Sequence, residues 1–387
     1  NHVNLPAGTS LFTFIVSSVL ESKEFNDSYI KILIKNRVRH LPANHFEAIN
    51  EGGEKKPSLG ELLLLTIAKN LTNQKEANSS DIHVLLEELD YVGEHYTNIP
   101  YIDYYKAKSY LTLKDFKSAE KAILSYLKKR SKEHLAWELL SDIIDDQDRK
   151  IQALCKTVIC HSNPGQLLRS QTKLFYLLIK EKEFVVAKSL HQSITNTHRE
   201  LGKKSSEEWL SFTNEPWFKN AKRDLSFFTY CYRRSKEIVA YVFEDWKAQN
   251  GIIYGLNLAK DLAEFVVADD IHGAFKFFGD KNLKVGDFVS LKLQRVANHE
   301  GVRYKALHFE KSDKRPKRTI YKVVEDHIRE DSDGHYVGSV PINFSFAESK
   351  GYNLGDVVRV KAVKLPSSKF RENSKWKVLS MFSKKSE

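Results

Sequence analysis

The stretch from Tyr104 to Leu127, YYKAKSYLTLKDFKSAEKAILSYL, holds two apolar patterns of helical spacing separated by a short polar turn. Its apolar residues recur three and four positions apart, which is typical of an amphipathic helix. The small residue near its centre returns at a fixed step, because Ala119, Ala153 and Ala187 stand 34 apart in the numbering. Recurrence at such a step is the signature of a stacked repeat architecture. We therefore expect stacked helix pairs in this part of the chain.

Two further sets of positions keep the same step, namely Ala107, Ser141 and Phe175, and Tyr110, Ile144 and Leu178. A two-helix unit of this length, with a small residue where the helices cross, resembles the tetratricopeptide repeat. The resemblance covers about residues 100–200 and fails at Asp103, where a large residue is usual, and at Phe175, where a small one is usual. It implies a right-handed superhelix whose concave surface binds a protein partner, or a solenoid that only positions the rest of the chain. No pattern of Asn and Lys predicts a site that clamps a carboxylate.

From about residue 237 the pattern changes from helical to alternating. EIVAYVFED (237–245) reads as a strand, and turn pairs come later at Asn250-Gly251, Glu300-Gly301 and Asp333-Gly334. Two series of predicted strands occupy this part of the chain, and they look like copies of one unit. VGDFV (285–289) and LGDVV (354–358) correspond at a constant offset of 69 in the numbering. We expect two similar small β-barrels.

A five-stranded unit with a hydrophobic-Gly-Asp turn before its fourth strand resembles the cold-shock-like branch of the OB-folds. The resemblance covers about residues 237–311 and 318–385, and an SH3-like barrel is the structural alternative. It implies that the barrels hold single-stranded nucleic acid, RNA rather than DNA, by stacking bases on aromatic side chains beside a basic groove. The expected fold class is therefore α + β multidomain, with an all-α solenoid at 1–220, one barrel at 221–312 and another at 313–387.

The candidate nucleic-acid-binding residues are aromatic and basic side chains of the two predicted barrels. Each aromatic has an alternative role in a barrel core, and each basic residue can belong to a solvated loop. Tyr241 and Phe243 share one face if residues 237–245 form a strand. The candidates are Tyr241, Phe243, Tyr254, Phe265, His272 and Phe275 in the first barrel, and Tyr336, Phe344, Phe346, Lys364, Lys369, Arg371 and Trp376 in the second.

Between the barrels lies a cluster in which five of the eight residues from Lys311 to Arg318 are basic. Such a cluster neutralises phosphates and makes binding strongly salt-dependent. The alternative is a linker whose charges only keep the chain in solution. The candidates for binding are Lys314, Arg315, Lys317 and Arg318.

The net charge lies mainly in the predicted barrels. The 387-residue chain has 61 Lys and Arg against 50 Asp and Glu, a formal charge of +11. Residues 221–387 hold 31 of these basic residues against 22 acidic ones, an excess of +9, whereas residues 1–220 are close to neutral. Such an asymmetry indicates a nucleic-acid or other acidic partner of the C-terminal part.

Signals of catalysis, cofactors and membranes are missing from the sequence. It has no Walker A loop, dinucleotide fingerprint, His-Glu-x-x-His or Gly-x-Ser-x-Gly motif, and its three cysteines lack zinc spacing. The longest apolar stretches are LFTFIVSSVL (11–20) and ELLLLTIA (61–68), and both are shorter than the ~20 residues that span a bilayer. A secretory signal would need a basic segment before Leu11, and the sequence has none there. We expect a cytoplasmic non-enzyme without metal or cofactor.

Three functions fit these observations. The first is an adaptor that binds single-stranded nucleic acid with its barrels and a protein partner with its solenoid. The second is a scaffold that binds only proteins. The third is an accessory subunit of a nuclease or defence complex, because the overall build resembles bacterial proteins that join such repeats to cold-shock-like domains, some of them in anti-phage gene sets.

Overall fold

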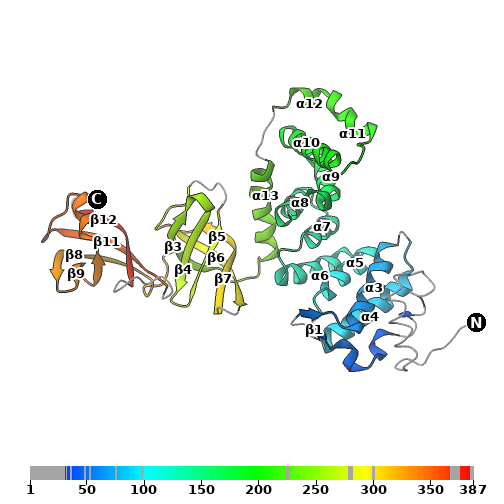
Figure 1. Ribbon diagram of the computed structural model, residues 1–387, viewed down its shortest axis with the longest axis horizontal. Coiled ribbons are helices and arrows are strands. Elements are labelled where there is room, and N and C mark those ends of the chain that lie inside the picture. Colours follow the sequence, from blue (N-terminus) through cyan, green and yellow to red (C-terminus); the bar gives the residue numbers. More distant parts are fainter. Residues whose placement is uncertain are drawn as a thin grey trace, which may run out of the picture. The chain divides into compact units, whose positions relative to one another are not determined.

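Helix pairs make up most of the first part of the chain, and two five-stranded sheets make up most of the rest (Figure 1). The computed structural model describes residues 31, 33–34, 37–47, 49–51, 54–74, 76–96, 99–161, 163–222, 227–277, 282–298, 301–366 and 375–383. The chain divides into two units, Asn1–Ile238 (the helical unit) and Val239–Glu387 (the strand unit). The expected fold class is confirmed.

After the helical residues Lys31, Leu33 and Ile34, the described part of the helical unit has two short 3-10 helices and a β-hairpin that the sequence did not predict. These are η1 (Val38–His40), η2 (Ala43–Phe46), β1 (Ile49–Glu51) and β2 (Glu54–Lys56). The longer helices are α3 (Leu59–Asn73), α4 (Ser79–His95), α5 (Ile102–Thr112), α6 (Phe116–Lys129), α7 (His134–Ile143), α8 (Gln147–Cys160), α9 (Pro164–Lys180), α10 (Phe184–Glu200) and α13 (Phe227–Val242). Between α10 and α13 lie α11 (Glu207–Ser211), η3 (Phe212–Asn214) and α12 (Pro216–Asn220).

The period of the sequence repeat corresponds to one helix pair. Ala119, Ala153 and Ala187 lie on α6, α8 and α10, the second helices of three successive pairs, and all are fully buried. A methyl side chain lets a neighbouring helix pack closely, so the recurring alanine marks the same contact in each pair. The helical repeat predicted from the sequence is confirmed.

The turn that joins the helices of a pair recurs two periods apart. Lys114 and Lys182 both adopt positive φ, 62° and 61°, before α6 and α10. The next residue in each case, Asp115 or Glu183, donates its backbone N–H to a carbonyl five residues back, at 2.9 Å. This bond satisfies a carbonyl that the end of the first helix would leave unpaired.

Phe175 occupies a position where a repeat usually has a small residue, and the segment after α10 explains why it fits. Its ring centroid lies 4.6 Å from that of Trp209 on α11 and 5.0 Å from that of Phe212 on η3. Short irregular helices pack here in place of another regular pair, and they leave room for a large ring.

The strand unit contains two sheets with the same order of neighbours. The first barrel consists of β3 (Gln249–Asn257), β4 (Leu262–Ala268), β5 (Ile271–Lys276), β6 (Phe288–Asn298) and β7 (Gly301–Lys311), with η4 (Leu258–Lys260) after β3. It closes in the order β3-β4-β5-β7-β6. The second consists of β8 (Tyr321–Asp331), β9 (Gly334–Val337), β10 (Val340–Ile342), α14 (Phe344–Ser349), β11 (Val357–Lys364) and β12 (Trp376–Ser383). Its order is β10-β9-β8-β11-β12, an OB-like barrel in which β10 and β12 form no ladder among the described residues.

The two Gly-Asp turns adopt the same conformation, as their correspondence in the sequence predicts. Gly286 has a φ of 95° and Gly355 a φ of 88°, in the region that favours glycine. Their N–H groups donate to Ile253 O and Ile328 O, each at 2.8 Å. The turns therefore fix the entry into β6 and β11 in the same way.

Several local predictions are wrong. Residues 237–242 belong to helix α13 instead of a strand, and Asn250-Gly251 lies inside β3. The hairpin turn at Asp333-Gly334 is confirmed, whereas residue 300 of the Glu300-Gly301 pair lies outside the described residues. The barrel boundaries at 221 and 313 stay predictions. No helix in the described part of the chain is long and apolar enough to cross a membrane, and residues 11–20 lie outside that part.

Candidate nucleic-acid interface

The outer face of β3 and β4 in the first barrel is covered by the second barrel. Buried apolar residues from both barrels form one cluster there, and each is at most 8% exposed: Ile252, Tyr254, Val266, Ile320, Tyr321 and Val363. At the edge of the cluster, Lys364 Nζ forms a 2.7 Å ion pair with Asp269. Lys377 Nζ also donates to Tyr254 O at 2.8 Å. The two barrels therefore pack face to face, and burial raises the pKa of Tyr254.

This packing and the core of the first barrel account for most of its candidate aromatic residues. Phe265 and Phe275 lie inside the barrel and Phe243 is fully buried after α13. Tyr241 lies on helix α13, so the strand face that it was expected to share with Phe243 does not exist. His272 stays half-buried on β5. The core rings and Tyr254 offer no face on which a base could stack.

The basic residues between the barrels form a surface loop with buried anchors. Lys314, Arg315, Lys317 and Arg318, here called the basic loop, are all exposed. Pro316 within the loop is buried, and Ile320 just after it is fully buried between the barrels. The N–H of Ile320 also donates to Lys317 O at 3.0 Å. Buried side chains within and after the loop therefore anchor it and place its four basic residues at the surface.

Shortly after the basic loop, the second residue of strand β8, Lys322, contacts an aromatic ring. Lys322 Nζ lies 4.1 Å from the centroid of the Trp376 ring and donates to Ser339 Oγ at 2.8 Å. Burial lowers the pKa of Lys322. We call Lys322, Ser339 and Trp376 the β8 end. Here a cation already lies over one face of the indole, and Trp376 also packs against the core of the second barrel.

The remaining aromatic candidates lie on or next to β9 and α14. Tyr336 is half-buried and stands between Arg329 and Pro341 in the register of β8, β9 and β10. Phe344 stacks on His335 with ring centroids 4.4 Å apart. Phe346 on α14 is 39% exposed, more than any other candidate ring.

Some predicted residues have other roles or cannot be placed. Lys364 pairs with Asp269 at the contact between the barrels. Lys369 and Arg371 lie outside the described residues. Arg329 was missed as a candidate, although alternation along β8 places it beside Tyr336, and Lys322 was counted only with the linker. Strand register was the signal that could have found both.

No group of three or more His, Cys, Asp or Glu side chains that could hold a metal ion occurs within the described ranges. The polar chemistry at the interface is that of ammonium, guanidinium and aromatic groups.

Two segments of the chain match known protein families. Residues 100–237 match a domain of unknown function, DUF7017. Residues 243–306, which cover most of the first barrel, match S1/CSD-like domain 1 of the TOTE conflict systems. No curated protein matches the chain.

The chain also has similarity to solved structures. One is MamA, from residue 41 to its end, of Desulfovibrio magneticus RS-1, with 15% identity and a TM-score of 0.37 over 50% of this chain and 98% of that chain. Another is the MamA RS-1 ArsTM double mutant, with 16% identity and a TM-score of 0.36 over 49% of this chain and 94% of that one.

Proposed function

We propose that the protein is a non-catalytic adaptor that binds single-stranded nucleic acid, RNA in preference to DNA, through its strand unit and a protein partner through its helical unit. The observation that carries the first part is the ordered basic loop next to the β8 end. The S1/CSD-like match lies in the first barrel, and it supports this part of the proposal because the second barrel has the same strand order and such domains are OB-like barrels associated with nucleic acids. Helix pairs that expose one face to a partner support the second part.

The first barrel has a supporting role in this proposal. Its outer β3–β4 face is covered by the second barrel, so the nucleic acid runs over the basic loop, the β8 end and the face of β9 and α14. The loop contributes four cations that contact phosphates, whereas Trp376, Tyr336 and Phe346 contact bases. Each stacked base is worth about 1–3 kcal/mol.

A salt titration of the full-length chain tests the proposal. Fluorescence anisotropy with labelled oligouridylate and oligothymidylate should show micromolar or tighter binding at low salt, with oligouridylate bound more tightly. The affinity should fall steeply as the salt concentration rises. Reversing Lys314, Arg315, Lys317 and Arg318 to Glu should weaken binding at least about a hundredfold, because four phosphate contacts are replaced by repulsion.

A matched control keeps the same change in net charge. Lys203, Lys204, Lys219 and Lys222 are exposed in the helical unit, and their reversal to Glu should change the affinity by less than about threefold. Equal losses in both variants would mean that only net charge matters. No binding of either oligonucleotide at low salt would remove the nucleic-acid part of the proposal.

A second candidate is an accessory subunit of a conflict or defence system, which the description of the S1/CSD-like family favours. In that case a partner carries the catalysis. Purification under native conditions in the presence of nuclease should then recover a stoichiometric protein partner. A scaffold that binds only proteins would show the same partner, but the reversal of the basic loop would leave its function intact.

A further inference from the structure

The first helices of successive pairs, α3, α5, α7 and α9, present charged and apolar side chains along one face each. Residues three, four and seven positions apart share a face of a helix. Leu62 and Lys69 therefore lie on one face of α3, and Leu135 shares a face of α7 with Glu138. The same relation joins Tyr104 with Lys108 on α5, and Arg169, Lys173 and Tyr176 on α9. We call this surface the inner groove.

Helix α7 lies between the helices that carry these side chains, since it contacts α5 and its Glu138 and Asp142 pair with Lys173 on α9. Most of its residues are buried, whereas Leu135 is 51% exposed and Asp142 is also exposed. Burial lowers the pKa of Lys108 on α5, and the nearby charges of Arg169 on α9 and Lys69 on α3 lower it further. Lys108 also contacts Asn73 on α3 through a 2.7 Å hydrogen bond, one helical turn from Lys69, so these two cations lie on neighbouring helices.

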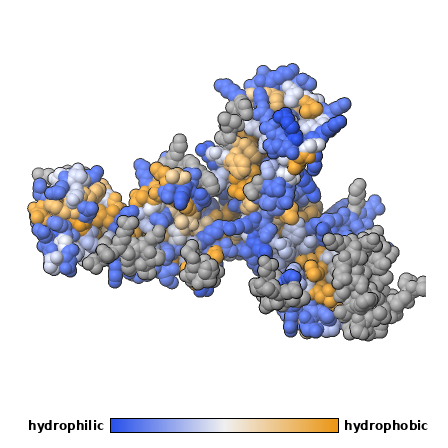
Figure 2. Space-filling view, viewed as in Figure 1, coloured by the Kyte–Doolittle hydropathy of each residue, from blue (hydrophilic) through white to orange (hydrophobic). Residues whose placement is uncertain are grey.

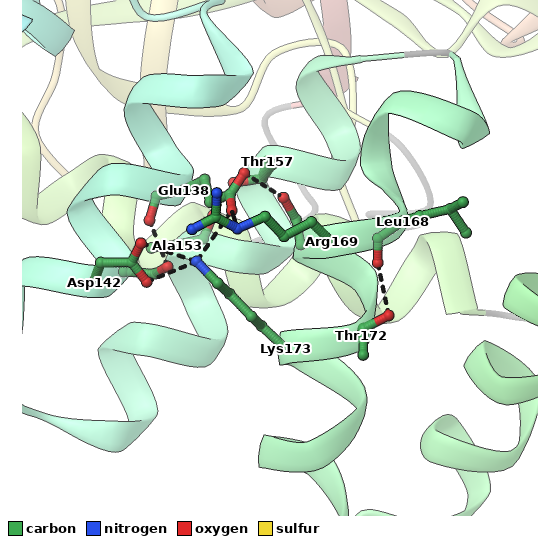
Figure 3. A network of polar contacts seen from close by, with 10 residues as sticks. Glu138, Asp142, Ala153, Thr157, Leu168, Arg169, Thr172 and Lys173 are labelled. Atoms are coloured by element: carbon green, nitrogen blue, oxygen red, sulfur yellow. Dashed lines mark hydrogen bonds and ion pairs between the residues drawn. The ribbon is translucent and has the colours of Figure 1, made fainter. Parts of the chain in front are cut away.

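The carboxylates of the groove are already paired with a single helix. Glu138, 8% exposed, accepts a hydrogen bond from Ser170 Oγ at 2.8 Å and pairs with Lys173 Nζ at 3.0 Å and Arg169 Nε at 3.1 Å. Lys173 Nζ also binds Asp142 at 2.8 Å (Figure 3). Burial raises the pKa of Glu138, but these cationic and hydrogen-bonding partners together hold it below its usual value.

The remaining cations lack such compensation. Lys108 Nζ donates to the neutral amide of Asn73 at 2.7 Å, and Lys69 is exposed. No carboxylate forms an ion pair with either lysine within the described ranges. Arg169 uses only its Nε toward Glu138, and its side chain is 75% exposed. Its outer nitrogens can therefore still bind a carboxylate in bidentate fashion.

Exposed apolar side chains lie among these cations. Leu62 is 43% exposed, Leu135 51% and Tyr176 44%, and they come from three of the helices that line the groove. The face shown in Figure 2 is mainly hydrophilic, with hydrophobic side chains gathered in patches. Apolar groups beside uncompensated cations are typical of a protein-binding surface with a charge preference.

We propose that the inner groove binds an acidic peptide segment of a protein partner, whose carboxylates contact Lys69, Lys108 and Arg169 and whose apolar side chains contact Leu135 and Tyr176. This inference rests on the protein-binding part of the proposed function and names its chemistry. A nucleic acid fits the groove less well. The exposed Leu62 and Leu135 are suited to contact the apolar side chains of a peptide, and they offer no ring on which a base could stack.

Anisotropy with two labelled peptides and the full-length chain tests the proposal at low ionic strength. One peptide alternates Glu and Leu, and its counterpart alternates Lys and Leu. The acidic peptide should bind at least about tenfold more tightly. Lys69→Glu and Lys108→Met should each weaken it about tenfold, and Leu135→Ser about fivefold. Lys121→Glu, an exposed change on the second helix α6, should alter the affinity by less than about twofold.

Thermal unfolding of each variant shows whether the fold survives. If Lys108→Met does not fold, Lys69→Glu, a change at an exposed position, still tests the proposal. Equal affinity for both peptides, or no binding of the acidic one at about 1 mM, would overturn the proposal. So would a loss of oligouridylate binding in the Lys69→Glu variant, because the groove would then be a nucleic-acid site. If oligouridylate never binds but the acidic peptide does, only the nucleic-acid part of the proposed function fails.

Discussion

His191 on α10 is a buried histidine that the fold holds in its neutral form. It is 2% exposed, its ring stacks on Trp209 at 4.5 Å, and its Nε2–H donates to Trp209 O at 2.8 Å. Burial lowers its pKa, although the bond to Trp209 O opposes the shift. Its contribution to stability is therefore complete above about pH 6.5 and is lost as the pH falls toward the lower pKa of the folded state.

We expect the helical unit to lose up to about 1.4 kcal/mol of unfolding free energy per pH unit below pH 6.5 through His191. Urea unfolding followed by tryptophan fluorescence at pH 7.5 and pH 5.5 measures the change. The His191→Gln variant keeps a donor for Trp209 O but does not titrate, so its loss between these pH values should be smaller. Identical losses in both proteins would contradict this account.

At the level of single residues, periodicity predicted which positions are equivalent but not which way a ring points. The step of the repeat correctly placed Ala119, Ala153 and Ala187 at helix contacts. Alternation in β3 and β4 could not distinguish a ligand face from a packing face, because both faces of these strands are apolar. Tyr254 points outward as a binding residue would, but the second barrel covers it.

Gly273 allows β5 and β7 to close the first barrel. These strands pair in parallel through Gly273 with Tyr304 and Ala274 with Lys305. A Cβ at Gly273 would lie 2.1 Å from Tyr304 O and 3.0 Å from the Phe265 ring. Both neighbours are fixed, one in the ladder and one in the core, so neither can move aside easily.

Gly273→Ala should therefore destabilise the strand unit by about 2–4 kcal/mol and leave the helical unit unchanged. Amide hydrogen exchange resolves the two units, and the loss of protection should be confined to β4, β5 and β7. Ala274→Ser, at the exposed neighbouring position, is the matched control and should behave like the wild type. Unchanged protection in the Gly273→Ala variant would mean that the strands can separate without cost.

At the level of elements, strands bounded by the Gly-Asp turns were predictable because those turns need a special conformation. The error at residues 237–245 has a different origin. Ile238, Val239, Val242 and Phe243 are buried on helix α13 and just after it, at helical spacing. The same short run also alternates well enough for a strand, and a window this short does not separate the two periods.

At the level of the strand unit, the excess of positive charge predicted an acidic partner for the barrels, but it gave no sign of the contact between them. The cluster between them joins residues that lie far apart in the sequence, among them Ile252, Tyr321 and Val363. Nothing in a strand's own pattern reports which other barrel will cover it. This contact turns the linker into an anchored loop and moves the candidate interface to the second barrel.

Separating the barrels should release the basic loop. Val363 is fully buried between the barrels, so Val363→Asp would place an unpaired carboxylate in an apolar contact and weaken the docking by about 3 kcal/mol or more. Trypsin cleaves after the exposed Lys314, Lys317 and Arg318, and the anchors Pro316 and Ile320 restrain these sites in the wild type. Cleavage between the barrels should therefore become at least about tenfold faster in the variant.

Val357→Asp is the matched control, because Val357 lies on the same face of β11 but outside the contact between the barrels. It should leave the rate of cleavage in the loop close to that of the wild type. Gel bands at the mass of the second barrel and at that of the helical unit with the first barrel would show that Val363→Asp leaves both fragments folded and protease-resistant. If the loop is cleaved at the same rate in all three proteins, contact between the barrels does not restrain it. The proposal that this contact holds the four cations in place for phosphates would then be wrong.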